Sequence, residues 1–230
     1  MAHLSRSRAP KNWPIKRKET KWTTRPSPGA HPKDRCITSS LMIKEMLHYA
    51  STTREVKYIV SSKSILVNKK PILDFHLGIG FMDIVEIPET KEAYRMILNR
   101  EGKFELIQLK KELENLKPSK IINKKVLRGK KIQLNLIDSR NILVDRDVYK
   151  TGDTLVLDIS KNSIHAQLKL EKGCEVFLLG GKHMGTHGKV TEIIQEKNLN
   201  EDRVLIKTQD SQFETLKKYV FVIESKFLEK

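Results

Sequence analysis

The residues whose types and spacing could best bind a ligand lie in the stretch GGKHMGTHGK, which runs from Gly180 to Lys189. Glycines interspersed with lysines and histidines are typical of loops that hold a phosphate. A Walker A loop, however, needs a glycine, four further residues and then Gly-Lys-Ser/Thr. Gly188-Lys189 precedes a valine, and His183 stands where the first glycine is required; in the alternative frame a threonine replaces the lysine. We therefore predict no nucleoside triphosphate site here.

The same glycines favour a different use. Glycine has no Cβ atom, so a glycine-rich backbone can come close to a flat ligand. We expect this loop to approach a polyanion, with Lys182, His183 and Lys189 at its rim.

The two histidines of this loop are candidate metal ligands. His183 and His187 lie four residues apart, which is ligand spacing on a helix, but a loop with so many glycines is not expected to be helical. The chain has two cysteines, Cys36 and Cys174, and they form no pair with zinc-ligand spacing. We predict no metal site.

Catalysis finds little support in the sequence. The motifs HExxH, GxSxG and CxxC are absent. Asp74 or Asp83 could serve as a general acid, but neither has a supporting partner in the sequence, and aspartate is common in turns for structural reasons. We therefore predict no catalytic residue, no cofactor and no enzymatic activity.

The charge of the chain points to its partner. The 230 residues carry a formal net charge of +16, and residues 1–35 hold ten Lys/Arg against two Asp/Glu, which is half of that excess. Such a charge predicts a polyanionic partner, either nucleic acid or an anionic membrane face.

A membrane partner is disfavoured by three features. No run approaches about 18 apolar residues, and the start lacks the apolar stretch of a secretory signal. Five prolines would break an N-terminal amphipathic helix. Low cysteine usage indicates a reducing, cytosolic compartment.

Residues 1–38 are predicted to form an extended basic arm. Their prolines favour extended backbone, and their cations repel one another, so we expect a mobile arm in the isolated protein. The alternative is a disordered solubility tail. Trp13 and Trp22 favour an arm that docks on a partner, because an exposed tryptophan is costly unless it stacks or packs.

The rest of the chain predicts an α+β fold that is mostly β. Apolar spacing favours a helix over 39–51, and Thr52 with Glu55 fits the capping box of a second helix, before two short strands. The stretch YRMILNREGKFELIQL predicts a hairpin with Gly102 in its turn, and the alternation of Ile132, Leu134 and Leu136 predicts a further strand. Several short strands after residue 170 suggest a small closed barrel. The predicted parts are the arm (1–38), a two-helix and strand unit (39–92), a central β domain (93–170) and a barrel (171–230).

Several stretches together resemble one family. HLSRSRAPKNWPI, RPSPGAH, GFMDIVEI, TGDTLVLDI and GCEVFLLGGKHMGTHGKV follow one another over nearly the whole chain. In this order they are similar to the small-subunit ribosomal protein "S four, e-type" family of archaea and eukaryotes. The chain departs from that family at Lys69, where a glycine is expected between two strands. It ends soon after the predicted barrel, which favours an archaeal source.

The resemblance implies what each part does. Residues 39–92 would be an RNA-binding unit of the ribosomal S-four type, and residues 171–230 an SH3-like barrel with a KOW motif. The protein would be a structural constituent of the small ribosomal subunit in the cytoplasm, with small-subunit rRNA and neighbouring ribosomal proteins as partners. Charge and resemblance together predict these RNA-binding residues: Arg6, Arg8, Lys11, Trp13, Lys16, Arg17, Lys18, Lys21, Trp22, Arg25, His31, Lys33, Arg35, Lys44, Arg54, Lys57, Lys63, Lys69, Lys70, Lys182, His183 and Lys189.

Two other functions remain open at this point. The 39–92 unit could target an RNA-modifying enzyme, such as a pseudouridine synthase, but residues 93–230 show no recognisable active-site stretch for it. An RNA-binding protein that acts outside the ribosome could use the same unit.

Overall fold

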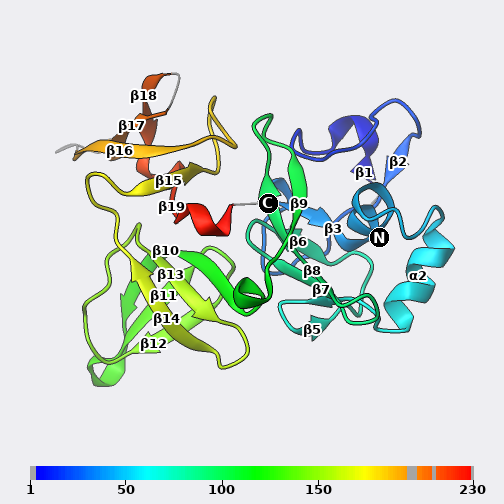
Figure 1. The fold of residues 1–230 in the computed structure, drawn as a ribbon, viewed down its shortest axis with the longest axis horizontal. Coiled ribbons are helices and arrows are strands. Elements are labelled where there is room, and N and C mark those ends of the chain that lie inside the picture. Colours follow the sequence, from blue (N-terminus) through cyan, green and yellow to red (C-terminus); the bar gives the residue numbers. More distant parts are fainter. Residues whose placement is uncertain (1–3, 196–200, 209–210, 229–230) are drawn as a thin grey trace. The chain divides into compact units, whose positions relative to one another are not determined.

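The computed structural model describes residues 4–195, 201–208 and 211–228, and the chain divides into two compact units (Figure 1). Unit 1 runs to Asn115, and unit 2 begins at Leu116. The first three residues of the predicted arm lie outside the described residues, as do 196–200, 209–210 and 229–230 of the predicted barrel.

Unit 1 contains a small mixed set of elements. Its strands are β1 (Leu4–Ser5), β2 (Trp22–Thr23), β3 (Cys36–Thr38), β4 (Leu66–Val67), β5 (Lys70–Pro71), β6 (Gly78–Gly80), β7 (Ile84–Ile87), β8 (Glu92–Leu98) and β9 (Phe104–Gln108). Its helical elements are α1 (Ser39–Leu41), α2 (Thr53–Ser61), the short π-helix η3 (Met42–Met46) and the 3-10 turns η1 (Arg6–Arg8), η2 (Lys33–Arg35) and η4 (Lys111–Leu113).

The two predicted helices are present, although the first is shorter than expected. It starts at Ser39 after the cap residue Thr38, whose hydroxyl accepts the N–H of Leu41, and it continues as η3 only to Met46. The capping box of α2 is confirmed, with Thr52 and Glu55 bonding reciprocally. Val56 and Val60 bury one face of α2 against the unit, as their spacing predicts.

The main sheet of unit 1 has the strand order β5-β4-β7-β8-β9. The turn between β4 and β5 places Asn68 and Lys69 at φ values of 50° and 64°, the left-handed geometry that favours glycine. Because β8 pairs with β7, the hairpin β8–β9 belongs to this sheet. The predicted division between residues 92 and 93 therefore cuts a continuous sheet, and the compact unit extends to Asn115.

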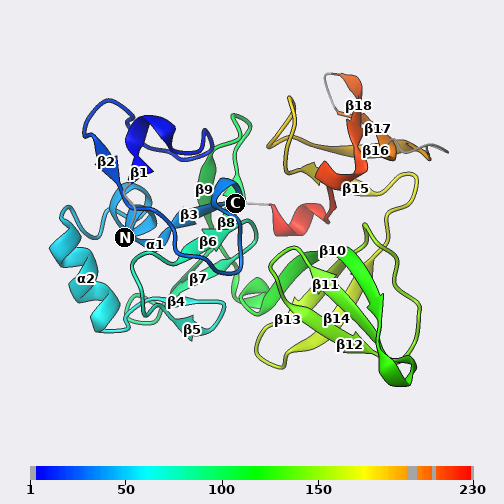
Figure 2. The same ribbon diagram turned by 180° about the vertical axis from the view of Figure 1, so that it is seen from behind.

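Residues 4–35, the N-terminal segment, differ most from expectation, because they pack on the rest of unit 1 instead of extending away from it. β1 pairs with β2, and the segment returns to β3, which pairs with β6. The dark blue trace stays beside the rest of unit 1 in opposite views (Figures 1 and 2). The physical reason is Trp13, which is 1% exposed and donates its indole N–H to the Cys36 carbonyl at 2.7 Å. A buried, hydrogen-bonded tryptophan is a strong anchor.

Unit 2 contains two antiparallel five-stranded sheets, with orders β12-β11-β10-β13-β14 and β18-β17-β16-β15-β19. The first comprises β10 (Leu116–Val126), β11 (Ile132–Leu136), β12 (Asn141–Val144), β13 (Thr154–Asp158) and β14 (Ser163–Leu168). The second comprises β15 (Glu175–Leu178), β16 (His187–Ile194), β17 (Arg203–Lys207), β18 (Gln212–Leu216) and β19 (Val220–Val222). Short 3-10 turns complete the unit: η5 (Arg128–Lys130), η6 (Lys217–Tyr219) and η7 (Ser225–Phe227).

Each sheet of unit 2 has its own core. The predicted alternation of Ile132, Leu134 and Leu136 is confirmed, since all three are buried in the first sheet. A buried lysine links the sheets: the Lys120 ammonium donates to the carbonyls of Lys217, Lys218 and Val220 at 2.6 to 3.1 Å. Lys117, beside it on β10, forms a buried ion pair with Asp138 at 2.8 Å. Both lysines therefore have structural roles.

Candidate nucleic-acid interface

A buried polar network fixes the end of the N-terminal segment on unit 1. The Asp83 carboxylate accepts the Gly80 N–H at 2.7 Å and the Asn68 amide at 2.8 Å, and it lies 2.9 Å from His31 Nε2. Gly80 leaves room for this contact, because a Cβ atom there would lie 2.5 Å from the His31 ring. His31 is thus a docking residue.

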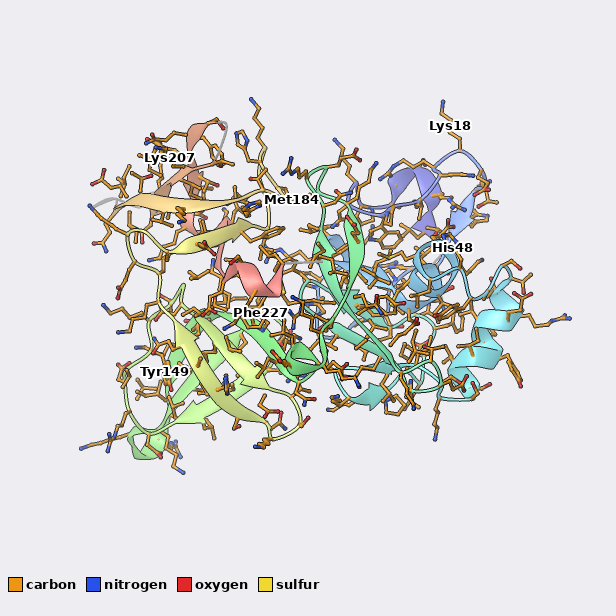
Figure 3. The ribbon with its side chains drawn as sticks, viewed as in Figure 1. Lys18, His48, Tyr149, Met184, Lys207 and Phe227 are labelled. Carbon is orange, nitrogen blue, oxygen red and sulfur yellow. The ribbon has the colours of Figure 1, made fainter. Side chains whose placement is uncertain are left out.

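Docking places a dense set of cations on one segment. None of the exposed predicted cations has a carboxylate oxygen within 4 Å among the residues that the structure describes. Lys18 extends from its ribbon into solvent (Figure 3). Unpaired cations gathered on one segment repel one another, so a polyanion that neutralises them is favoured. The exposed cations of this segment are Arg8, Lys11, Lys16, Lys18, Lys21, Arg25, Lys33 and Arg35.

Four predicted residues of this segment have roles within the protein. Arg6 is buried and contacts Glu45 at 3.1 Å and Glu19 at 3.4 Å. Arg17 donates to the carbonyls of Ala9 and Pro10 at 2.8 and 2.7 Å. Together with Trp13 and His31, these side chains hold the segment in place and do not form an exposed contact surface. Trp22 differs, since half of its surface is exposed.

A second group of exposed cations lies on and after α2. Arg54, Lys57, Lys63 and Lys70 are exposed and unpaired within the described part of the chain. The Lys57 ammonium lies 5.2 Å from the centroid of the Phe75 ring, which orients it by a cation–π contact. Two predicted neighbours are less available: Lys69 pairs with Glu86 at 2.8 Å, and Lys44 is half-buried.

The predicted glycine loop of unit 2 presents Lys182 and Lys189 to solvent, while His183 stacks on Phe213 with ring centroids 3.8 Å apart. Two of the glycines serve the fold. A Cβ atom at Gly180 would lie 2.6 Å from the Tyr219 ring, and one at Gly188 would lie 2.8 Å from Ile206 and from the Lys207 carbonyl. At these two positions, glycine permits close packing within the protein and not the expected approach to a ligand.

The register of this sheet reveals a cation that the sequence reasoning missed. Lys207 of β17 (Figure 3) is exposed and lies directly opposite Lys189 of β16. Like charges on directly opposed strand positions are destabilising unless something neutralises them. Glu175 lies opposite Lys189 on its other side. Only the strand pairing could have identified Lys207, because it lies 18 residues after Lys189.

A fourth basic surface, at the turn between β10 and β11, was also missed. Lys125, Arg128, Lys130 and Lys131 are exposed and have no carboxylate within 4 Å in the described ranges, whereas Lys124 pairs with Asp147. The signal was available in the sequence as KKVLRGKK, a run with five cations and no acid. We call these four unpaired residues the β10–β11 tip.

The structure gives the candidate catalytic residues other roles. The Asp83 carboxylate belongs to the buried network around His31. The Asp74 carboxylate accepts hydrogen bonds from the Ser27 hydroxyl at 3.1 Å and from the backbone N–H of His76 at 2.9 Å. Within residues 4–195, 201–208 and 211–228, no three His, Cys, Asp or Glu side chains are grouped as metal ligands. In the same ranges, no helix is long and apolar enough to cross a membrane. Cys36 and Cys174 are both unbridged thiols.

Comparison with known proteins finds relatives that all belong to one family of ribosomal proteins. The family model "Ribosomal family S4e" matches residues 90–164, and the "RS4NT (NUC023) domain" matches residues 2–34. Small ribosomal subunit protein eS4 of Methanosphaera stadtmanae is 37% identical over 221 residues, covering 96% of this chain and 91% of that protein. The eS4 protein of Methanocaldococcus jannaschii is 39% identical over 232 residues, covering 96% and 93%.

A solved structure agrees with these relatives. The crystal structure of the 30S ribosomal protein S4e from Thermoplasma acidophilum superposes with a TM-score of 0.71 at 28% sequence identity. The match covers 83% of this chain and 96% of that one.

Proposed function

The chain belongs to the S4e family of ribosomal proteins, and from this premise we propose that its unpaired surface cations bind folded rRNA of the small subunit. It is a structural constituent of the small ribosomal subunit, and it is not an enzyme. The alternative of an RNA-modifying enzyme is therefore set aside. The place of action is the cytoplasm, as part of the ribosome, with neighbouring small-subunit proteins as further partners.

The observation that carries the proposal is the contrast between paired and unpaired cations. In the 3-10 turns η6 and η7, Lys218 and Lys226 have carboxylate partners. In the N-terminal segment and on α2, the exposed predicted cations have none among the described residues. Cations that neutralise phosphates release the counterions condensed on RNA, and this release drives association.

The mechanism differs from that of a mobile arm. Because residues 4–35 are held by Trp13, Arg6 and His31, the cations are positioned before RNA arrives. A preorganised surface loses less conformational entropy on binding than a flexible segment does. RNA specificity would come mainly from shape, since a folded RNA presents its phosphates in a fixed pattern.

Each part of the chain contributes its own contacts to this binding. The region around α2 in unit 1 acts as an RNA-binding unit of the ribosomal S-four type. The C-terminal sheet acts as an SH3-like barrel with a KOW motif, and Lys182, Lys189 and Lys207 are its phosphate contacts. The β10–β11 tip adds a fourth contact region.

Sedimentation of native extract tests the proposal. The chain should co-migrate with small ribosomal subunits through a sucrose gradient and should leave them only at high salt, because counterion release weakens with salt. Recovery of the chain at the top of the gradient at low salt, with small subunits complete without it, would overturn the proposal and favour a role outside the ribosome.

A further inference from the structure

We propose that a cavity beside Trp22 binds a single unpaired nucleotide of rRNA, with the base stacked on the indole and the phosphate held by Arg8, Arg25 and Lys33. This inference rests on the proposed function and names a specific contact within it. The cavity has a volume of about 700 Å³ and is lined by Leu4, Ser5, Ser7, Arg8, Trp22, Arg25 and Lys33. Small-molecule sites typically measure about 300–1,000 Å³, so one nucleotide fits the size of this cavity.

The charge of the lining selects an anion. The cavity wall carries three cationic side chains and no carboxylate. A second cavity of about 540 Å³ also touches Trp22, but its wall combines Arg6 and Lys44 with Glu19 and Glu45. Arg6 contacts both of those glutamates, so its charge is already compensated. An anionic ligand is therefore expected in the first cavity and not in the second.

Trp22 is placed as a stacking surface. Its side chain is 50% exposed, whereas that of Trp13 is 1% exposed. The backbone at Trp22 is fixed by pairing with Ser5, and the Arg6 N–H donates to the Lys21 carbonyl at 3.0 Å. The Lys21 ammonium lies 5.2 Å from the centroid of the Trp22 ring, and this cation–π contact helps to orient the indole. A base that stacks on an indole oriented in this way costs little further conformational entropy. Such stacking accepts any base, because every base has a π-face.

The remaining lining suits the polar edge of a nucleotide. The hydroxyls of Ser5 and Ser7 lie 2.8 Å apart and can donate to or accept from a base or a ribose. Bases in a duplex are stacked on one another and cannot reach an indole, so the ligand is a loop, bulge or end whose base is turned out. An acidic peptide from a neighbouring protein would use the cations but would leave the indole without a flat partner.

Tryptophan fluorescence of the full chain tests the proposal directly. We expect a short single-stranded oligonucleotide to quench the emission in a saturable way, and a fully paired duplex of the same length to quench it much less. Trp22→Ala should abolish the quenching, because the remaining Trp13 is buried. It should also weaken oligonucleotide binding about 5- to 150-fold, the usual effect of removing one base–aromatic stack. Tyr49→Ala is the matched control, since this tyrosine is 44% exposed and lies outside the cavity wall.

A second pair of variants tests the phosphate contacts. Arg25→Gln should weaken oligonucleotide binding, whereas Lys161→Gln, which removes an exposed cation of unit 2, should not. Affinity for small-subunit rRNA, measured in parallel by filter binding, separates the two proposals. If rRNA binds but oligonucleotides neither quench Trp22 nor depend on it, the cavity proposal is overturned and the proposed function stands. If rRNA does not bind either, the proposed function fails as well.

Discussion

Cys36 is the residue that best reports whether the N-terminal segment is docked. Its side chain is fully buried, and its carbonyl accepts the indole N–H of Trp13. Burial raises the pKa of the Cys36 thiol to about 11, and the nearby charges of Asp83 and Asp34 add to the rise. Only the thiolate reacts with alkylating agents, so the folded protein should protect this position.

We expect Cys36 to be alkylated by iodoacetamide at pH 8 about 100-fold more slowly in the folded chain than in urea, as its pKa requires. Mass spectrometry of peptides measures the rate. Trp13→Ala should speed the reaction in the folded chain, because it removes the indole that holds residues 4–35 to the Cys36 backbone, whereas Trp22→Ala should not. Equal rates in folded and unfolded chains would show that residues 4–35 are not packed as described.

The two tryptophans also show what the sequence could and could not predict at this scale. Both were expected to pack on a partner, but Trp13 packs inside the protein itself, and the sequence could not tell which of the two points inward. Trp13 is buried because its indole N–H reaches the Cys36 carbonyl, a contact between residues 23 positions apart. Such tertiary contacts have no local signature. Tertiary contacts also bury Arg6 and His31, which the sequence predicted to be exposed.

At the scale of elements, the capping box of α2 makes a quantitative prediction. Thr52→Ala removes the hydroxyl that accepts the Glu55 N–H, so it should lower the free energy of unfolding by about 1 kcal/mol. Thr53→Ala, one residue further on, should change it by less than about 0.5 kcal/mol, because this exposed position has no cap to lose. Urea unfolding followed by circular dichroism measures both. Equal losses in the two variants would contradict the capping role.

The capping box of α2 also predicts that the stability of the protein depends on pH in the acid range. Hydrogen bonds from the Ser51 N–H first, and then from Thr52, lower the pKa of Glu55 from 4.5 to about 2. Because the folded pKa is the lower one, the stabilisation is complete above pH 4.5 and is lost as pH falls towards 2. Glu55→Gln should therefore make stability less dependent on pH within this window. An unchanged pH profile in urea unfolding would refute the assignment.

Single helices and strands could be predicted from the sequence better than the boundary between the two units. Local signals sufficed for the capping box and for the hairpin β8–β9, whose turn places Gly102 at a φ of 72°. The division after residue 92 was wrong because the pairing of β7 with β8 joins two predicted domains. A strand pattern states that a strand exists and which face is buried, but it does not identify the sheet that the strand joins.

At the scale of the whole molecule, net charge predicted the partner class but not the contact surfaces. Half of the excess charge lies in residues 1–35, which the sequence identified. Lys207 was missed because overall charge in the remainder is diluted by paired residues such as Lys172 with Glu192. The β10–β11 tip was missed although its run KKVLRGKK is visible in the sequence. Pairing decides which cations are available to phosphate, and only the folded chain reveals pairing.

The distribution of contacts can be measured through the salt dependence of rRNA affinity. Each phosphate contact contributes about 0.7 to 0.9 to the slope of log affinity against log salt. Glutamine at the four positions of the β10–β11 tip should therefore reduce the slope by about 3, if each side chain contacts one phosphate. Four cations of the N-terminal segment outside the Trp22 cavity, replaced in the same way, should give a similar reduction: Lys11, Lys16, Lys18 and Arg35.

The control removes the same charge from positions whose cations are already neutralised. Glutamine at Lys103, Lys172, Lys218 and Lys226 lowers the net charge equally, but each of these lysines has a carboxylate partner. This variant should leave the slope nearly unchanged, because no phosphate contact is lost. If it reduced the slope as much as the other two, binding would depend on the total charge of the chain and not on where the unpaired cations lie.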